Sequence, residues 1–288
     1  MKSNIDLGQI YKVHTDSYTV KAENRLIKCN ARGVLKIKSD GLSVGDYVRV
    51  EKNTILEILP RKNRFIRPNV SNVDLVVIVI SPEPKPDFYL IDKLVLNASK
   101  ENVDVVFVIN KTDLSDCLFD VVKEEYGNLN FTILKVSAID VSGIEQLKTL
   151  LNGKLSVLAG QSAVGKTSII NSMFGLSQKT GDLSEKILRG RHTTTRSEIF
   201  EQNNIKIIDS PGFAVIDANV DLDELPTCYS DYEEVSINCK FRGCSHVSEP
   251  DCAVKQMVEN GNFSKNRYER YVEIYNEIAK RRKIYEKN

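Results

Sequence analysis

The order of four short segments constrains the fold of this chain more than any other feature. Asn110-Lys111-Thr112-Asp113 and Ser137-Ala138 come first, Gly160-Gln161-Ser162-Ala163-Val164-Gly165-Lys166-Thr167 follows, and Asp209-Ser210-Pro211-Gly212 comes last. The third of these has the Gly-x4-Gly-Lys-Thr spacing of a phosphate loop. In most proteins that carry all four segments, the phosphate loop comes first. The order here predicts a nucleotide-binding fold that is circularly permuted, with every part retained.

The phosphate loop stands between a predicted strand at 155–159 and a predicted helix at 166–174, the context that its motif requires. We expect its backbone amides and the helix N-terminus to hold phosphate oxygens. Lys166 would reach the β- and γ-phosphates and support catalysis, and the Thr167 hydroxyl would bind Mg²⁺. Nucleotide contacts are assigned to the whole loop, 160–167, and to Ser168, which follows it.

Asn110-Lys111-Thr112-Asp113 selects the base. The Asp113 carboxylate can accept two hydrogen bonds, from N1–H and the exocyclic amine of guanine, and adenine does not offer this pair of donors. Asn110 would brace the base and the nearby loop, while the Lys111 stem covers the ring. A backbone amide of Ser137-Ala138 would reach the guanine O6. The nucleotide is therefore expected to be GTP or GDP.

Arg189-Gly190-Arg191-His192-Thr193-Thr194-Thr195 lies where a switch segment is expected. Thr194 is the first choice, and Thr193 the second, for a hydroxyl on Mg²⁺ and an amide on the γ-phosphate. A polar loop without a single essential threonine is the alternative. Asp209 would contact Mg²⁺ through water, and the Gly212 amide would bind the γ-phosphate.

Position 213 holds phenylalanine, where many GTPases have a glutamine that orients the attacking water. A phenyl ring cannot orient water, so we expect slow intrinsic hydrolysis that another residue or a partner must complete. His192 is the nearest protonatable side chain in the sequence and is the candidate catalytic group. Its alternative role is to shape the switch loop.

Cys239-x4-Cys244-x-His246-x5-Cys252 offers three thiolates and one imidazole, the ligand set of a closed structural Zn²⁺ site. Free buried cysteines are the alternative. The other three cysteines, Cys29, Cys117 and Cys228, are scattered, a pattern that favours a reducing cytosol over a disulfide scaffold. The chain has no signal-peptide core and no apolar run of membrane-spanning length, so a cytoplasmic protein without membrane contact is expected.

Three domains are predicted: an oligonucleotide-binding (OB)-like β-barrel with its linker at 1–68, an α/β domain at 69–217 and a zinc-binding helical domain at 218–288. Residues 1–68 carry fourteen Lys and Arg against seven Asp and Glu, which fits either nucleic-acid binding or a solvated basic face. Short barrel strands are expected at 8–13, 18–20, 26–29, 33–37, 46–50 and 54–59, and 60–68 reads as a basic, Pro-containing linker.

The α/β domain is predicted from near-continuous apolar runs at 75–80 and 103–109, typical of parallel strands covered on both faces. Crossover helices are expected at 87–101, 116–126 and 143–151, and a hairpin at 199–208. A final helix at 266–287 has apolar or aromatic residues at three- and four-residue spacing. Its basic run, 280–283, could contact phosphates or simply end the helix.

The whole chain resembles the RsgA/YjeQ family of circularly permuted bacterial GTPases that depend on the small ribosomal subunit. The marks of the resemblance, in addition to the nucleotide segments, are Gly45-Asp46-x-Val48, Pro60-Arg61-x-Asn63-x3-Arg67-Pro68, His192-Thr193-Thr194-Thr195, Pro211-Gly212-Phe213 and Glu249-Pro250-x-Cys252-Ala253-Val254. Ala163 departs from the glycine usual in the family.

The resemblance implies a cytoplasmic, monomeric GTPase that docks on the small ribosomal subunit late in assembly and leaves after hydrolysis. Mg²⁺ would accompany GTP or GDP, one structural zinc ion would be bound, and the barrel and zinc module would contact ribosomal RNA. We further expect that movement of the γ-phosphate sensor at 209–213 acts directly on the zinc module that follows it. Two other functions fit the residues: a nucleotide-gated RNA-binding module without a ribosomal role, and an enzyme that phosphorylates a small substrate with GTP.

Overall fold

The structure, a computed structural model, describes residues 5–37, 41–175, 197–209 and 216–285. The chain divides into two compact units. The first unit comprises residues 1–77, 143–159 and 166–214, and the second comprises residues 78–142, 160–165 and 215–288. Each unit is therefore assembled from three separate stretches of the sequence.

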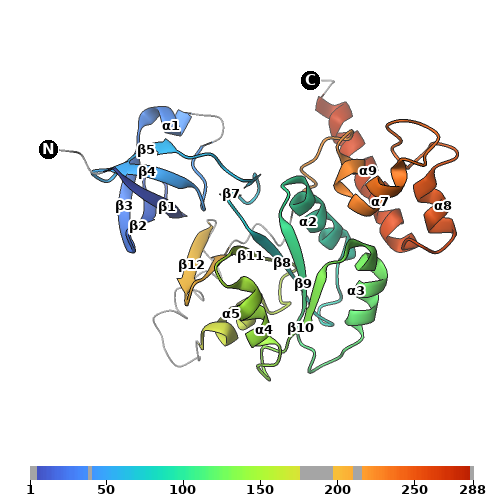
Figure 1. The fold of residues 1–288 in the computed structure, drawn as a ribbon, viewed down its shortest axis with the longest axis horizontal. Coiled ribbons are helices and arrows are strands. Elements are labelled where there is room, and N and C mark those ends of the chain that lie inside the picture. Colours follow the sequence, from blue (N-terminus) through green and yellow to red (C-terminus); the bar gives the residue numbers. More distant parts are fainter. Residues whose placement is uncertain (1–4, 38–40, 176–196, 210–215, 286–288) are drawn as a thin grey trace. The chain divides into compact units, whose positions relative to one another are not determined.

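A closed five-stranded barrel forms the N-terminal part of the first unit, drawn in blue in Figure 1. β1 pairs antiparallel with β2 and with β4, while β5 pairs parallel with β3 and antiparallel with β4. Alternate residues such as Ile10, Val20 and Ile55 point inward and are fully buried. This confirms the predicted barrel. Its strands are β1 (Asp6–Val13), β2 (Tyr18–Ala22), β3 (Arg25–Ala31), β4 (Tyr47–Glu51) and β5 (Thr54–Ile58).

The strand predicted at 33–37 is wrong. These residues form a short helix, α1 (Gly33–Ile37), which connects β3 to β4. The helix buries Leu35 in the barrel core and leaves Val34 exposed. Five residues of mixed polarity fit either periodicity, so the sequence could not decide between them. The helical turn is favoured because it brings Leu35 into the barrel core.

The predicted linker, 60–68, is held against the barrel. It contains the short strand β6 (Arg64–Phe65), which pairs antiparallel with β7 (Val70–Ser71). The fully buried Asp46 carboxylate accepts hydrogen bonds from Arg61 Nε at 2.6 Å, from Arg61 Nη2 at 2.8 Å and from Ser71 Oγ at 2.6 Å. A buried charge needs such partners, so this network fixes the start of the linker.

The remainder of the first unit contains strands and helices of the α/β fold. β11 pairs parallel with β13, and β13 pairs antiparallel with β12, as the predicted hairpin requires. β12 also pairs with the barrel strand β1 through Lys12 and Glu198. The elements are α4 (Ile144–Leu151), β11 (Leu155–Ala159), α5 (Lys166–Phe174), β12 (Glu198–Gln202) and β13 (Ile205–Asp209).

The second unit contains the other parallel strands. β8 runs from the first unit into the second, and β9 pairs parallel with β10. Every residue of β8 is buried, and so is all of β9 except Asp104, which confirms the prediction of strands covered on both faces. The elements are β8 (Leu75–Ile80), α2 (Phe88–Lys100), β9 (Asp104–Ile109), α3 (Leu118–Tyr126), the 3₁₀ turn η1 (Gly127–Leu129) and β10 (Thr132–Lys135).

A helical module ends the second unit, and we call residues 220–285 the C-terminal module. Its core includes Tyr271, Ile274 and Ile278 of the last helix, three of the residues whose spacing predicts that helix. Its elements are η3 (Leu225–Cys228), α7 (Ser230–Ser236), α8 (Ala253–Glu259) and α9 (Lys265–Tyr285). No helix of the described residues combines the length and apolarity that crossing a membrane requires.

The C-terminal module packs on α2 and α3 through charged side chains, and α9 lies beside α2 (Figure 1). Arg270 on α9 binds the buried Asp92 carboxylate of α2, and its Nη2 lies 2.8 Å from Glu125 Oε2 of α3. Lys93 Nζ lies 2.7 Å from Glu277 Oε2. These ion pairs, of which the two made by Arg270 are buried, join the module to α2 and α3.

The chain enters the C-terminal module through residues 216–220, which lie along α2. Asn97 donates from Nδ2 to the Asp217 carbonyl oxygen at 3.0 Å and accepts from the Asn219 backbone N–H at 3.0 Å. Arg281 Nη2 donates to the Ala218 carbonyl oxygen at 2.7 Å, and Arg282 pairs with Asp223 at 3.7 Å. Two cations of the basic run at 280–283 therefore contact the protein itself.

Candidate nucleotide site and candidate metal centre

The phosphate loop follows β11 and leads into α5, as predicted. Gly160 has φ +132°, and a Cβ there would stand 2.2 Å from the Val79 carbonyl oxygen. Gly165 has φ +95°, and a Cβ there would stand 2.2 Å from Asn110 Nδ2. Both positions need glycine, for backbone conformation and for space. Close packing against β8 and Asn110 thus sets the path of the loop.

Ala163 adopts a left-handed conformation, with φ +65°. An alanine in this region costs roughly 1 kcal/mol relative to glycine. Its side chain is exposed, as are those of Ser162, Thr167 and Ser168, so the methyl group meets no obstruction. Alanine is therefore compatible with the loop at a small cost in backbone strain.

Asn110 and Lys111 join the guanine-recognition segment to the phosphate loop. Asn110 Nδ2 donates to the Val164 carbonyl oxygen at 2.9 Å, and its Oδ1 accepts from the Ala138 backbone N–H at 3.3 Å. Lys111 Nζ donates to the Ala163 carbonyl oxygen at 2.9 Å and to that of Glu83 at 2.5 Å. The buried Asn110 amide therefore links three of the four nucleotide segments.

Asp113 and Ser137 lie together at the ends of two neighbouring strands. Ser137 Oγ donates to Asp113 Oδ1 at 2.7 Å and accepts from the Asp140 backbone N–H at 3.1 Å. Thr112 Oγ1 donates to the Val136 carbonyl oxygen at 3.2 Å. These bonds hold the Asp113 carboxylate in place and leave it with acceptor capacity for a base.

Lys166 is the first residue of α5, and the predicted nucleotide residues after residue 175 lie at or beyond the limits of the described chain. Asp209 ends β13, where its backbone pairs in register with Glu198. His192, Thr193, Thr194, Gly212 and Phe213 fall outside the described residues. Their assigned roles stay predictions.

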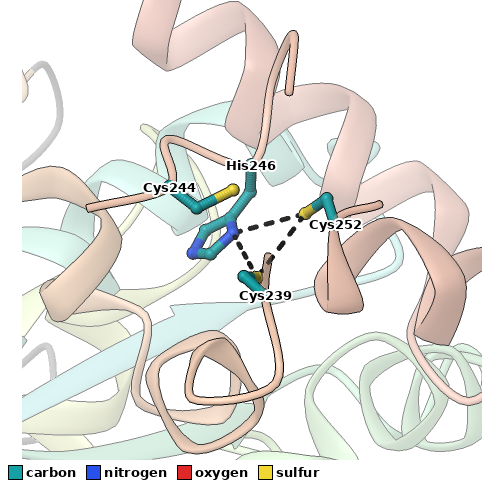
Figure 2. Close-up of side chains that lie close together, drawn as sticks. All are labelled: Cys239, Cys244, His246 and Cys252. Carbon is teal, nitrogen blue, oxygen red and sulfur yellow. Dashed lines mark hydrogen bonds between the residues drawn. The ribbon is translucent and has the colours of Figure 1, made fainter. Parts of the chain in front are cut away.

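The four predicted metal ligands come together in the C-terminal module. The ligand atoms of Cys239, Cys244, His246 and Cys252 all lie within 4.8 Å of one another. His246 Nδ1 is 3.4 Å from Cys252 Sγ and 3.7 Å from Cys239 Sγ, and these two sulfurs are 4.0 Å apart (Figure 2). A tetrahedral site with metal–sulfur bonds of about 2.3 Å has sulfur–sulfur edges of about 3.8 Å. The cluster therefore fits a metal of zinc's size and ligand preference.

Burial affects the imidazole and the thiols of the cluster differently. Burial lowers the pKa of His246, which keeps the imidazole neutral as a ligand must be. Burial also raises the pKa of Cys244, to about 12, so without a metal this thiol keeps its proton near neutrality. A bound cation would reverse that preference by displacing the proton. In this buried cluster, a bound metal would stabilise the thiolate form, which burial alone disfavours.

Glu249 organises the loop between the ligands. Its carboxylate accepts from the Ser245 backbone N–H at 2.9 Å, from Ser245 Oγ at 2.8 Å and from the Val247 and Ser248 backbone N–H groups at 3.2 Å each. Burial alone would raise the pKa of Glu249, but these hydrogen bonds lower it to about 2. Glu249 thus acts as a charged cap that shapes the metal-binding loop.

Sequence reasoning missed the contacts made by the connection between β8 and α2, residues 81–87. Gln161 of the phosphate loop accepts from the Asp87 backbone N–H at 2.8 Å and donates to the Lys85 carbonyl oxygen at 3.3 Å. The prolines at 82, 84 and 86 mark this connection as stiff. The prolines indicated a loop after the strand, but not the side chain that binds it.

Two family models match the chain. The model described as RsgA GTPase matches residues 58–219, more than half of the chain, and the model described as RsgA N-terminal domain matches residues 7–55. The chain belongs to the RsgA GTPase family. It is accordingly a GTP-hydrolysing enzyme.

Relatives in the RsgA family match this chain over nearly its full length and over nearly the full length of their own chains. A Thermotoga maritima protein named Small ribosomal subunit biogenesis GTPase RsgA is 38% identical over 96% of this chain and 98% of its own. A protein of the same name from Geobacillus sp. (strain WCH70) is 35% identical over 96% and 99%.

Two solved structures have the same architecture as this chain. The crystal structure of YjeQ from Thermotoga maritima has a TM-score of 0.80 at 33% identity, covering 96% of this chain and 99% of that one. The structure of YloQ, described as a circularly permuted GTPase, has a TM-score of 0.77 at 30% identity, covering 96% of each chain. The predicted circular permutation is confirmed.

Proposed function

We propose that this protein binds the small ribosomal subunit, acts in its late assembly and hydrolyses GTP with stimulation by the subunit. The observation that carries the GTPase part is the bonding of Asn110 to both the phosphate loop and Ala138, which unites the reordered segments in one site. The ribosomal part rests on relatives that are named for small ribosomal subunit biogenesis and match almost end to end.

In the nucleotide site we assign Mg²⁺, bound with GTP or GDP, to the hydroxyls of Thr167 and Thr194 and, through water, to Asp209. Lys166 would bind the β- and γ-phosphates, and the Gly212 amide would sense the γ-phosphate. His192 is proposed to complete the catalytic site, because Phe213 cannot orient water. The His192→Ala variant should bind GDP normally and lose most of the stimulated hydrolysis.

In the metal centre we propose one structural zinc ion. Three thiolates and one imidazole fill the four positions of a tetrahedral Zn²⁺ site and leave none open for catalysis. The ion would fix the fold of residues 239–252. Metal analysis of the purified chain tests this directly, and one zinc per chain is the expected result.

For docking we propose that the barrel and the C-terminal module contact ribosomal RNA. The excess of Lys and Arg over residues 1–68 supports attraction to phosphates. We further propose a cytoplasmic monomer with the three predicted domains, 1–68, 69–217 and 218–288. Movement of the γ-phosphate sensor would be transmitted to the C-terminal module along residues 216–220.

The deciding experiment measures initial GTP hydrolysis by the protein alone, with small subunits, with large subunits and with an equal mass of unrelated structured RNA. Strong stimulation by small subunits alone is expected. Equal rates in all four mixtures would contradict the assembly role and favour a GTP-binding RNA module. Transfer of the γ-phosphate to an acceptor other than water would favour the third function, phosphorylation of a small substrate.

A further inference from the structure

The conformation of the phosphate loop is restrained by two sets of side-chain contacts. Three of its residues, Gly160, Ala163 and Gly165, have positive φ angles. Asn110 and Lys111 bind the carbonyl oxygens of Val164 and Ala163 from the guanine-recognition side. The left-handed conformation of Ala163, which residues other than glycine rarely adopt, persists only where its surroundings restrain it. A second set of contacts restrains the first half of the loop.

The second restraint is the Gln161 side chain, which reaches residues 85–87. Its Oε1 accepts from the Asp87 backbone N–H at 2.8 Å, and its Nε2 donates to the Lys85 carbonyl oxygen at 3.3 Å. Both polar atoms of the amide are used in this way, and each bond goes to the backbone. The contact thus depends on the shape of the connection and not on the side chains of residues 85 and 87.

The connection itself is anchored at both ends. Ser81 Oγ donates to the Glu83 carbonyl oxygen at 2.7 Å, and Lys111 Nζ donates to the same oxygen at 2.5 Å. At the other end, Asp87 caps α2 by accepting from the Leu90 backbone N–H at 3.0 Å. Three prolines within seven residues fix φ at three positions. Gln161 therefore binds a rigid support and not a loose loop.

We propose that Gln161 is a positioning residue, which acts on the nucleotide through the backbone of the phosphate loop. Its two bonds to residues 85–87 hold the first half of the loop, while Asn110 and Lys111 hold the second half. Together they keep the loop amides in the arrangement that receives phosphate oxygens. Loss of the Gln161 bonds allows other loop conformations, and apparent affinity falls in proportion to the competent fraction.

The test compares two variants of the full chain that separate the Gln161 contact from the stability of α2. Gln161→Met keeps the length of the side chain and removes both hydrogen bonds. Asp87→Ala removes the α2 cap but keeps the backbone N–H that Gln161 accepts. Gln146→Ala, at an exposed position of α4, is the matched control. Dissociation constants for fluorescent GDP and a non-hydrolysable GTP analogue are measured, with KM, kcat and Tm.

Gln161→Met should bind both nucleotides about three- to tenfold more weakly, as the loss of one or two hydrogen bonds predicts. Its kcat at saturating GTP should stay within twofold of the original, so the effect appears in KM. Asp87→Ala should lower Tm and leave the dissociation constants within twofold. Gln161→Ala, a second variant without the bonds, should reproduce the weakening.

Unchanged nucleotide affinity in both Gln161 variants would overturn the proposal. So would an equal weakening in Asp87→Ala, since that would trace the effect to α2 stability alone. The measurements use no ribosomal subunit, so their outcome is independent of the proposed partner.

Discussion

The barrel and the C-terminal module are attached to the α/β fold by contacts of different kinds. The barrel binds β12 through Lys12–Glu198 and Lys21–Glu201, each 2.5 Å, whose side chains are 23–35% exposed. The module binds α2 and α3 through Arg270, whose partners Asp92 and Glu125 are 1% and 6% exposed.

Solvent exposure decides how much each of these ion pairs contributes to the free energy of unfolding. Exposed ion pairs contribute up to about 1 kcal/mol and weaken with salt. Removing one partner of a buried pair costs about 3–5 kcal/mol, because the other charge is left without compensation in the interior. The ion pairs of the barrel can therefore change at little cost, whereas those of the module resist change. This difference yields four predictions.

Removal of the proposed zinc ion should have the largest effect. It should show whether the C-terminal module can lose its own fold while its contacts with α2 persist. In small zinc modules, metal binding corresponds to about 10–16 kcal/mol of folding free energy. A strong chelator should remove amide-exchange protection from residues 239–252, while residues 88–100 stay protected, because the ion pairs of Arg270 involve none of the ligands.

Exchange measured by mass spectrometry with and without chelator tests the effect of metal removal. Cys252→Ala should behave like the chelated protein, and Cys117→Ala, at an exposed free cysteine, should behave like the original. Equal loss of protection in α2 would mean that the metal also maintains the attachment.

Arg270→Ala should destabilise the C-terminal module by about 3–5 kcal/mol. Burial raises the pKa of Asp92, and Arg270 opposes that shift, so the carboxylate loses its main compensating charge in the variant. Urea denaturation followed by exchange in residues 265–282 measures the change. Lys265→Ala, on the exposed side of the same helix, is the control.

A double variant sharpens the test of the Asp92–Arg270 pair. Asp92→Asn combined with Arg270→Met removes both charges and should recover part of the lost stability. A double variant as unstable as Arg270→Ala would place the loss in packing or in Glu125, which both variants leave without Arg270, and not in the Asp92 charge.

Glu201→Ala should cost the barrel attachment no more than about 1 kcal/mol. The Glu201 carboxylate accepts from Tyr11 and from Lys21 Nζ, yet it lies near the surface. Thermal unfolding of the barrel at low and high salt measures the effect, with Glu57→Ala, an exposed barrel position, as control. A loss as large as that of Arg270→Ala would remove the contrast between the two attachments.

Acid should weaken the barrel attachment only slightly. Burial alone would raise the pKa of Glu201, but hydrogen bonds from Lys21 and Tyr11 lower it below its ordinary value of 4.5. The folded protein then binds this proton less readily than the unfolded chain. The contribution is complete above pH 4.5 and is lost as pH falls through the lowered pKa. NMR titration of Glu201 should give a value below 4.5; a higher one contradicts the assignment.

The sequence predicted those parts of the fold that depend on local pattern. Buried apolar runs indicated β8 and β9, and the Cys and His spacing predicted a cluster that the structure brings together. The helix at Gly33–Ile37 was missed because its role in filling the barrel is set by distant strands. The Gln161 contact was missed for a similar reason, since its partners lie 74 and 76 residues away and are backbone atoms without a sequence signature.

The position of Asn97 determines which helices hold the chain between the α/β fold and the C-terminal module. The Asn97 side-chain amide forms hydrogen bonds with the backbone of residues 217 and 219. Arg281 donates a hydrogen bond to the carbonyl oxygen of residue 218, which lies between them. A displacement arriving at Ile216 would therefore act on α2 and α9 before it reached residues 239–252. A force applied to residues 216–220 would be divided between two helices. The four candidate metal ligands, which come later in the chain, would then bear little of it.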